Sequence, residues 1–314
     1  MVVRLRAKLY FIILAPLIFG MACKNRDQKS NVPNANADQK ISLPHNQRDS
    51  LGRPSIVSTT DWLMEAGLQQ VESVLYDTQN KALYASNGKD YKVGNDGFIS
   101  KISANGDLLQ LKWVVDLNRP TGMALFENML YIADVNQLVV IDTQTGNVLK
   151  KMKSPIENAG LNDVAITEKG DVYVTASFVH AVFKVVDGAL KTFVKDEESL
   201  QWANGIIAKD GLLWIAGLNL CTVVIETKEI KTVKLTPEVE DFDGICSDGG
   251  QGFFLTTVSN RALWHLNGSL QMSNLKDGKA YFGDLDYVQS HKSLYIPRGI
   301  GESGKFYISK YLLD

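Results

Sequence analysis

The sequence of 314 residues has few cysteines, no excess of one charge and no long apolar run. Its three cysteines form no CxxC pair and no Cys/His cluster, which excludes a disulfide scaffold and a thiolate zinc site. The 33 basic and 35 acidic residues give a net charge of −2, so we expect no nucleic-acid binding through a strongly basic surface. No phosphate-binding glycine loop, dinucleotide fingerprint or Ser–His–Asp order occurs in the context that each requires. The 45% of hydrophobic residues suffices for an ordinary globular core.

The apolar run at residues 9–19 is about half as long as a membrane-spanning helix must be. Three basic residues precede it, and Cys23 follows it after three small or flexible residues. This arrangement resembles the export signal of bacterial lipoproteins, whose cysteine is acylated, although Gly20 stands where that signal usually has Leu. We therefore predict a signal peptide over residues 1–22, lipidation of Cys23, and anchoring to the periplasmic or surface face of the cell envelope. A plain secreted protein is the alternative.

Residues 23–53 are rich in Asn, Gln, Asp, Lys and Pro and contain almost no apolar side chains. Such a segment cannot bury enough surface to offset the conformational entropy that ordering would cost. We therefore predict a flexible tether over residues 23–53 and a folded part over residues 54–314.

The folded part repeats one pattern six times: a polar anchor residue, a short alternating strand, a turn, and a second strand of the type Leu-Tyr-Ile-Ala. The anchors recur every 39 to 49 residues, a period typical of β-propeller blades. The units alternate with period two and are rich in Val, Ile, Tyr and Trp, which argues against a helical solenoid. We therefore predict an all-β fold, a six-bladed β-propeller. The anchors are Glu72, Thr121, Asn162, Asn204, Asp243 and Asp284.

The last unit has only three strands before the sequence ends, whereas residues 56–64 form an alternating apolar run that belongs to no unit. We predict that this N-terminal strand completes the last blade and removes an exposed sheet edge. An open ring with a three-stranded final blade is the alternative.

The anchor residues begin the innermost strands, so all six are expected to lie near the propeller axis. Three of them are carboxylates, which repel one another unless a cation neutralises them. An all-oxygen donor set suits a hard divalent ion, calcium first and magnesium, manganese or zinc next. The alternative is that pairs such as Thr121-Gly122 and Asp243-Gly244 are turns in which a polar side chain caps its own backbone.

Four anchor segments resemble those of the senescence marker protein/gluconolactonase/luciferin-regenerating-enzyme-like propellers, in order and in spacing. They are Glu72-Ser73, Asn162-Asp163, Asn204-Gly205 and Asp243-Gly244. The resemblance covers roughly residues 65–314. It implies one divalent metal with Glu72, Asn204 and Asp243 as ligands, Asp243 as general base, and Asn162 beside the metal in contact with substrate or water.

Two positions depart from the family pattern. Family lactonases have an arginine two residues before the Asn-Asp pair, and here that position is Gly160. We therefore expect a pocket that is not the standard sugar-lactone pocket. Asp284 is an additional axial carboxylate, for which a second base, a ligand and a solvated turn residue are the three interpretations; we favour the last.

The loops that open on the anchor face supply candidate substrate-binding residues. His180 is a candidate proton shuttle, with a packing or surface role as the alternative. Arg261 and Arg298 are candidate replacements for the absent arginine, or loop-stabilising charges. Trp202, two residues before Asn204, is the candidate site wall, whereas the other tryptophans are assigned to blade packing. The same loops carry Lys89, Tyr91 and Asp134.

Two functions follow from these observations. The first is a metal-dependent hydrolase of lactone or ester type, in which the ion polarises the carbonyl and Asp243 accepts a proton. The second is a non-catalytic propeller of the NHL kind that binds a small ligand or an envelope partner, since propellers host many functions. In both cases we expect a monomer with a small-molecule partner and a lipid anchor in the membrane.

Overall fold

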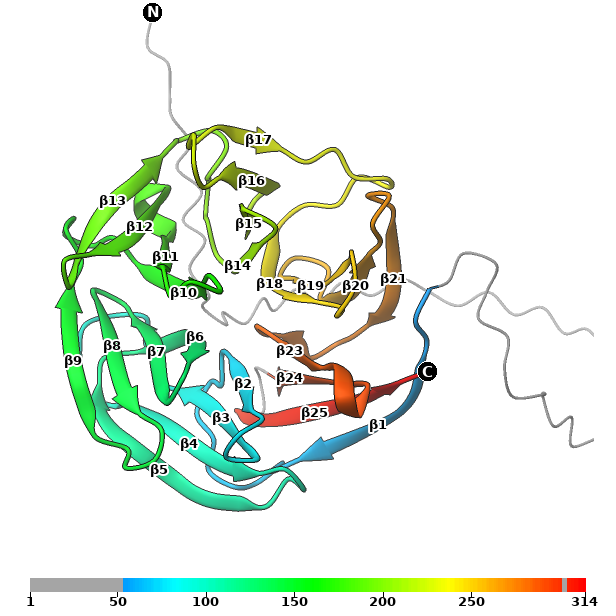
Figure 1. Ribbon diagram of the computed structural model, residues 1–314. Helices are drawn as coiled ribbons and strands as arrows, with labels where there is room; N and C mark the ends of the chain where they lie inside the picture. The colour runs from blue at the N-terminus through cyan, green and yellow to red at the C-terminus, as the bar shows by residue number, and fades with distance from the viewer. Residues whose placement is uncertain (1–52, 301–303) are drawn as a thin grey trace, which may run out of the picture.

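The computed structural model describes residues 53–300 and 304–314, whose strands form six sheets arranged as a ring around a central axis (Figure 1). The prediction of a six-bladed β-propeller is confirmed. Residues 1–52, with the predicted signal peptide, Cys23 and nearly all of the predicted tether, lie outside the described residues. None of the helices that the structure describes has the length and apolar character needed to cross a membrane.

Each of the first five blades is a four-stranded antiparallel sheet of consecutive strands, the first one innermost. Blade 1 comprises β2 (Val74–Asp77), β3 (Ala82–Asn87), β4 (Gly97–Ser103) and β5 (Leu108–Leu117). Blade 2 comprises β6 (Pro120–Phe126), β7 (Met129–Asp134), β8 (Gln137–Asp142) and β9 (Val148–Lys153). Blade 3 comprises β10 (Leu161–Ile166), β11 (Val172–Ala176), β12 (Ala181–Val186) and β13 (Ala189–Lys195), with the 3₁₀ turn η1 (Ser177–Val179) between its middle strands.

Blades 4 and 5 repeat this order. Blade 4 comprises β14 (Ile206–Lys209), β15 (Leu212–Ala216), β16 (Leu220–Val224) and β17 (Ile230–Thr232). Blade 5 comprises β18 (Phe242–Ser247), β19 (Phe253–Thr257), β20 (Ala262–Leu266) and β21 (Met272–Asp277).

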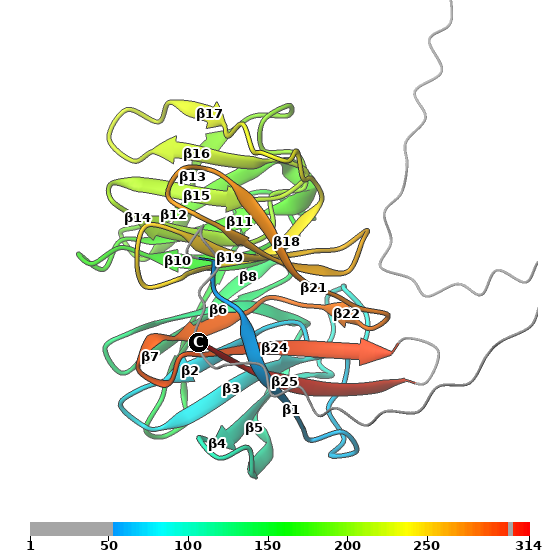
Figure 2. The same cartoon turned by 90° about the vertical axis from the view of Figure 1, so that its right-hand side faces the viewer.

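Blade 6 closes the ring with strands from both ends of the folded part. It contains β23 (Asp286–Val288), η2 (Gln289–His291), β24 (Ser293–Ile300), β25 (Lys305–Leu313) and the short β22 (Tyr281–Phe282). The N-terminal strand β1 (Ile56–Trp62) pairs antiparallel with β25, from Ile56 opposite Leu313 to Trp62 opposite Ile308 (Figures 1 and 2). The predicted closure is therefore confirmed, and the open-ring alternative is wrong.

The hydrophobic core lies between blades, as six clusters that each join two neighbours. Alternation along a strand sends successive side chains to opposite faces, so each blade packs against the blade on either side. In blade 3, for example, Tyr173 and Val182 pack toward blade 4, whereas Val174 and Phe183 pack toward blade 2. Both faces of a blade are therefore buried, so the inner strands carry apolar side chains on both faces.

In blades 3 and 5, a buried hydroxyl group on the second strand reaches the anchor segment of the next blade near the axis. Thr175 Oγ1 of blade 3 donates to the carbonyl of Asn204 in blade 4 at 2.6 Å. Thr256 Oγ1 of blade 5 donates to the carbonyl of Gly283 in blade 6 at 3.0 Å. These bonds fix the height at which the anchor residues lie, because they join the backbone segments that carry them.

Candidate functional site

All six anchor residues lie within two positions of the start of an inner strand, so the strands bring them to the axis as predicted. Neighbouring anchor segments are joined directly by their backbones. The amide of Asp284 donates to the carbonyl of Glu72 at 2.8 Å, and the amide of Gly205 donates to the carbonyl of Asp243 at 2.8 Å. Blades 6 and 1, and blades 4 and 5, therefore meet at the anchors themselves.

The Thr-Gly and Asp-Gly pairs are not turns, and the turn-capping interpretation is wrong at these positions. Gly122 lies within β6, and a Cβ atom there would be 2.0 Å from Oδ1 of Asp163 in the next blade. Gly244 lies within β18, and a Cβ atom there would be 2.5 Å from Oδ1 of Asp284. Glycine is required because the carboxyl group of the following blade occupies that space.

Four carboxyl groups are buried around the axis, those of Glu72, Asp163, Asp243 and Asp284, and all are less than a tenth exposed. Burial raises the pKa of each, because the charged form loses hydration. The charge of Asp284 further raises the pKa of Asp163, and the charges of Glu72 and Asp284 further raise that of Asp243. Burial brings the pKa of Asp284 to about 7. The axis therefore favours protons or cations.

Asp284 is not a solvated turn residue, and the interpretation favoured from the sequence is wrong. Its Oδ2 accepts a hydrogen bond from Ser73 Oγ at 2.7 Å, and its Oδ1 accepts one from the amide of Leu285 at 2.9 Å. Ser73 and Asp284 also form a parallel bridge between blades 1 and 6. The side chain is buried because closure of the ring brings these two blades together.

Sequence reasoning missed Arg119, whose buried guanidinium lies beside the axial carboxylate of Glu72. Its Nη2 is 3.4 Å from Oε2 of Glu72 and donates to the carbonyl of Gln70 at 2.8 Å. Its Nη1 donates to the carbonyl of Pro120 at 2.9 Å. Its aliphatic stem passes against Gly88, where a Cβ atom would be 2.5 Å from Cδ. No repeat or motif marks Arg119. Its partner Glu72 is 47 positions away in the sequence, in another blade.

The two axial asparagines differ in their contacts. Asn204 Nδ2 donates to Oδ1 of Asp243 at 2.8 Å, which joins two of the three predicted ligands. The side chain of Asn162 is half-buried, and within residues 53–300 and 304–314 it has no hydrogen-bond partner. Asn162 is thus free to contact a bound molecule, and its place beside a metal stays a prediction.

The predicted metal ligands Glu72, Asn204 and Asp243 offer only oxygen donors to a divalent ion. Among the described residues, no three His, Cys, Asp or Glu side chains are grouped to hold a metal, but the predicted set contains only two carboxylates and an amide. Arg119 supplies a positive charge beside Glu72, whereas the side chains of Asp163, Asp243 and Asp284 have no ion pair among the described residues. Carboxylate and amide oxygens are the donors that calcium and magnesium prefer. The donor types therefore suit such an ion, and its binding by these three residues stays a prediction.

A chain of aromatic rings borders the anchor face. Trp202 packs edge-on against Phe178, with ring centroids 6.2 Å apart, and Phe178 packs edge-on against Tyr91 at 5.5 Å. The amide of Trp202 donates to Nδ1 of His180 at 3.3 Å. Trp202 therefore belongs to a packed row of aromatic rings, and His180 accepts a hydrogen bond from its backbone. Their roles toward substrate stay predictions.

Gly160 has no room for the arginine of the family lactonases. Its φ of +64° is left-handed, and a Cβ atom would be 2.7 Å from the ring of Phe178. The aromatic border therefore occupies the space next to this position. The positive charge nearest the predicted ligands is that of Arg119 instead.

The two arginines predicted as replacements lie in loop and blade packing. Arg261 Nη1 donates to the carbonyl of Lys279, on the exposed side of blade 5. Arg298 is buried within blade 6, where its guanidinium stacks on Phe282 at 3.6 Å and donates to the hydroxyl of Tyr311. These contacts support the loop-stabilising interpretation of both, and a substrate role for either stays a prediction.

A cavity of about 640 Å³ opens at the opposite end of the axis, where the inner strands end. Asp163 and Asp284 of the axial cluster line it, together with Asp286, whose pKa burial raises to about 6. Aliphatic side chains of the inner strands, such as Ile206 and Ile245, form much of its wall. We call it the far-mouth cavity.

Solved structures with the same fold include enzymes. A virginiamycin B lyase from Staphylococcus aureus, in a catalytically inactive variant with quinupristin, matches with a TM-score of 0.58 and 12% identity over 82% of this chain and 99% of that one. A gluconolactonase from Xanthomonas campestris matches with a TM-score of 0.61 and 12% identity over 82% of this chain and 94% of that one. A putative gluconolactonase matches with a TM-score of 0.63 and 14% identity over 83% of this chain and 94% of that one.

No protein-family model and no curated protein sequence matches the chain. Identities this low establish architecture and not activity, and one propeller fold hosts many functions. The chain has the six-bladed propeller fold that the gluconolactonases and the virginiamycin B lyase also have.

Proposed function

We propose that the protein hydrolyses lactones or esters with a divalent metal ion, held on the propeller axis by Glu72, Asn204 and Asp243. The observation that carries the proposal is the burial around the axis of four carboxyl groups whose pKa values are all raised. Calcium is the preferred ion because every donor is an oxygen atom, and magnesium, manganese and zinc are alternatives.

Asp243 is the residue suited to accept a proton from an attacking water. Burial and the charges of Glu72 and Asp284 raise the pKa of Asp243, which makes its carboxylate a stronger base. Its Oδ1 is held by Asn204, and this bond fixes the orientation of the carboxylate. A divalent ion, when bound, would act as a Lewis acid toward the carbonyl oxygen and lower the pKa of water.

The surrounding side chains would bind and orient the substrate. Asn162 has a free amide next to the site, and Trp202 belongs to the aromatic border that would cover an organic ring. Arg119 supplies the guanidinium that Gly160 excludes, beside Glu72. A substrate with a polar carbonyl group and an apolar or aromatic body fits this combination better than a plain sugar lactone.

Calorimetric titration with Ca²⁺ tests the metal site. After treatment with a chelator and dialysis, the protein is expected to bind one ion, whereas Asp243→Asn and Glu72→Gln are expected to weaken binding at least about 10-fold. Asp248→Asn, in the same blade but away from the axis, is the matched control. If the purified protein binds no divalent ion, the hydrolase proposal is wrong. With metal bound, a panel of aromatic and sugar lactones assayed with and without chelator tests catalysis.

A non-catalytic binding propeller is the second candidate. It is favoured by the internal partners of the predicted ligands, because Glu72 contacts Arg119 and Asp243 accepts from Asn204 without any added group. In that case the protein binds its ligand equally well in chelator and turns over none of the lactones or esters.

A further inference from the structure

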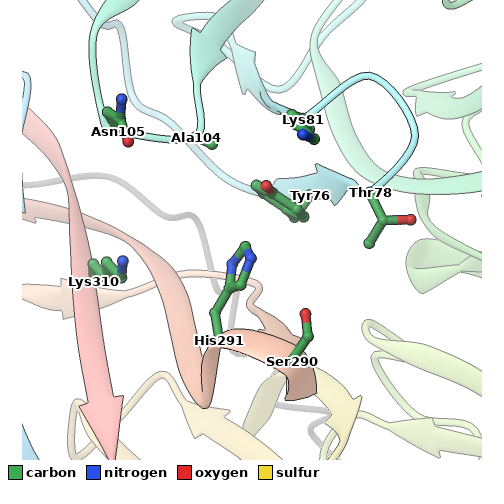
Figure 3. Close-up of a pocket in the computed structure, with 8 residues that line it drawn as sticks. All are labelled: Tyr76, Thr78, Lys81, Ala104, Asn105, Ser290, His291 and Lys310. Atoms are coloured by element: carbon green, nitrogen blue, oxygen red, sulfur yellow. The ribbon is translucent and has the colours of Figure 1, made fainter.

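A second cavity opens between blades 1 and 6, off the axis (Figure 3). Its volume is about 520 Å³, within the range of small-molecule pockets. Four separate elements surround it: the β2–β3 hairpin, the β4–β5 turn, η2 and β25. Because blade 6 is completed by ring closure, we call it the seam cavity. Its lining residues are Tyr76, Thr78, Lys81, Ala104, Asn105, Ser290, His291 and Lys310.

The lining is cationic. Lys81 lies above the cavity on the β2–β3 hairpin, Lys310 faces it from β25, and His291 projects into it from η2 (Figure 3). None of the lining residues is acidic. Two ammonium groups that face one space favour an anion there, since like charges without a counter-ion repel one another.

The polar side chains of this lining have no partners within the protein. Among the residues that the structure describes, the side chains of Thr78, Lys81, Asn105, Ser290 and His291 make no hydrogen bond or ion pair. Some lysines elsewhere in the ring are paired with carboxylates, as in the Lys184–Asp171 and Lys305–Glu65 pairs. The cavity therefore collects donors whose hydrogen bonds are available to a bound molecule.

One wall of the seam cavity consists of packed aromatic rings. The ring of Tyr76 stacks on Tyr295 with centroids 5.8 Å apart and planes 7° apart, and His291 packs edge-on against it at 5.3 Å. Lys310 Nζ lies 5.7 Å from the Tyr295 ring centroid and 5.7 Å from that of Trp62, which holds its stem in place. A preformed wall of this kind lowers the entropy that binding would cost.

We propose that the seam cavity binds a small anion with a hydroxyl-bearing body, such as a phosphorylated or carboxylated monosaccharide. Lys81 and Lys310 pair with the anionic group, and Thr78, Asn105 and Ser290 hydrogen-bond the hydroxyl groups. The site is separate from the proposed axial metal site and does not depend on any reaction there.

Calorimetric titration of the full chain tests the proposal with four probes. Glucose 6-phosphate and glucuronate represent the phosphate and the carboxylate, and glucose and inorganic phosphate represent the body and the anion alone. At least one anionic sugar is expected to bind with a Kd of about 1 mM or below, more tightly than glucose or inorganic phosphate. Added salt is expected to weaken this binding, because salt screens exposed charges. Failure of both anionic sugars to bind overturns the proposal.

Substitutions locate the site. Lys81→Gln and Lys310→Met are each expected to weaken binding about 10-fold, because each removes a charged hydrogen bond. The matched control is Lys169→Gln, an exposed lysine in the corresponding inner hairpin of blade 3, which is expected to bind as the unaltered protein does. Thermal unfolding of every variant verifies the fold. Equal affinity in the Lys81→Gln/Lys310→Met double variant, or equal loss in the control, overturns the proposal.

Discussion

The axis and the seam cavity are neighbouring polar regions whose linings carry opposite charge. Tyr76, Thr78 and Ser290 line both the seam cavity and the far-mouth cavity of the axis. The seam lining holds two lysines, a histidine and no acidic residue, whereas the far-mouth lining holds five acidic residues and no basic one. The five are Asp77, Glu127, Asp163, Asp284 and Asp286.

The two regions also differ in how far the protein already satisfies their polar groups. Axial carboxyl groups are buried and hydrogen-bonded across blades, as in the bonds from Ser73 to Asp284 and from the amide of Ile206 to Asp163. The seam lysines have no such bonds. We therefore expect stability and the proposed function to be coupled at the axis and separable at the seam, and four experiments test this difference.

Arg119→Met is expected to have the largest effect. It removes the guanidinium beside Glu72 and leaves a buried carboxylate without its cation, which costs about 3–5 kcal/mol in the free energy of unfolding. Urea denaturation at pH 8 in chelator measures this. Adding Glu72→Gln to the variant is expected to recover part of the loss. Equal stabilities of Arg119→Met and the unaltered protein would contradict the coupling of charge and stability at the axis.

Gly122→Ala is expected to have the second largest effect and to lower the free energy of unfolding by about 1–3 kcal/mol. The added methyl group meets both the carboxyl group and the Cα atom of Asp163, so a side-chain rotation alone cannot relieve the clash. The comparison is Gly250→Ala, where the nearest atom is 3.4 Å from the added carbon. Denaturant midpoints of the two variants give the difference, and similar midpoints would show that blades 2 and 3 can separate at the axis.

A smaller effect is expected from pH, measured in chelator. Burial raises the pKa of Asp286 to about 6, so its neutral form stabilises the fold fully below about pH 4, and this contribution is lost as the pH rises through 6. The melting temperature is therefore expected to fall between pH 5 and pH 8. Asp286→Asn is expected to flatten that decline and to melt about 2–4 °C above the unaltered protein at pH 8. A decline of unchanged slope in the variant would assign it to other groups.

The smallest change in stability is expected at the seam. Lys81→Gln/Lys310→Met is expected to shift the free energy of unfolding by no more than about 0.5 kcal/mol, because these side chains have no hydrogen-bonding or ionic partners to lose and methionine preserves the packed stem of Lys310. Denaturant titration measures the shift. A loss comparable to that of Gly122→Ala would mean that the seam lysines serve the fold.

The fold was predictable from the sequence because the patterns that specify a blade lie within one repeat. Alternation, turn residues and a recurring anchor each act within one blade, and counting strands in the last unit exposed the need for β1. The position of the anchors followed from the topology of a propeller. The contacts of Gly122 and Gly244 could not be predicted. In the sequence, a glycine that follows a polar residue is the same whether it forms a turn or packs against a carboxyl group of the next blade.

The charges at both sites were less predictable, because they depend on which blades become neighbours. Arg119 contacts Glu72 across the interface of blades 1 and 2, and nothing within its own repeat marks it as axial. The seam cavity joins Lys81 to Lys310, near opposite ends of the folded part. Arg298 was expected on a loop that faces the site. In the folded blade 6 it instead packs between Phe282 and Tyr311, which the sequence does not place beside it.

The pairing of β1 with β25 has a consequence for the order of folding. Ser55 donates through its amide to the carboxylate of Asp314 at 3.0 Å, across 259 positions of sequence. Contacts at such separation form late, because the entropy of closing the loop must be overcome first. Blades 1 to 5 are each built from consecutive strands and can form while the ring is open. The seam cavity and the Ser73–Asp284 bond exist only after closure, so a bound anion at the seam would hold the ring shut.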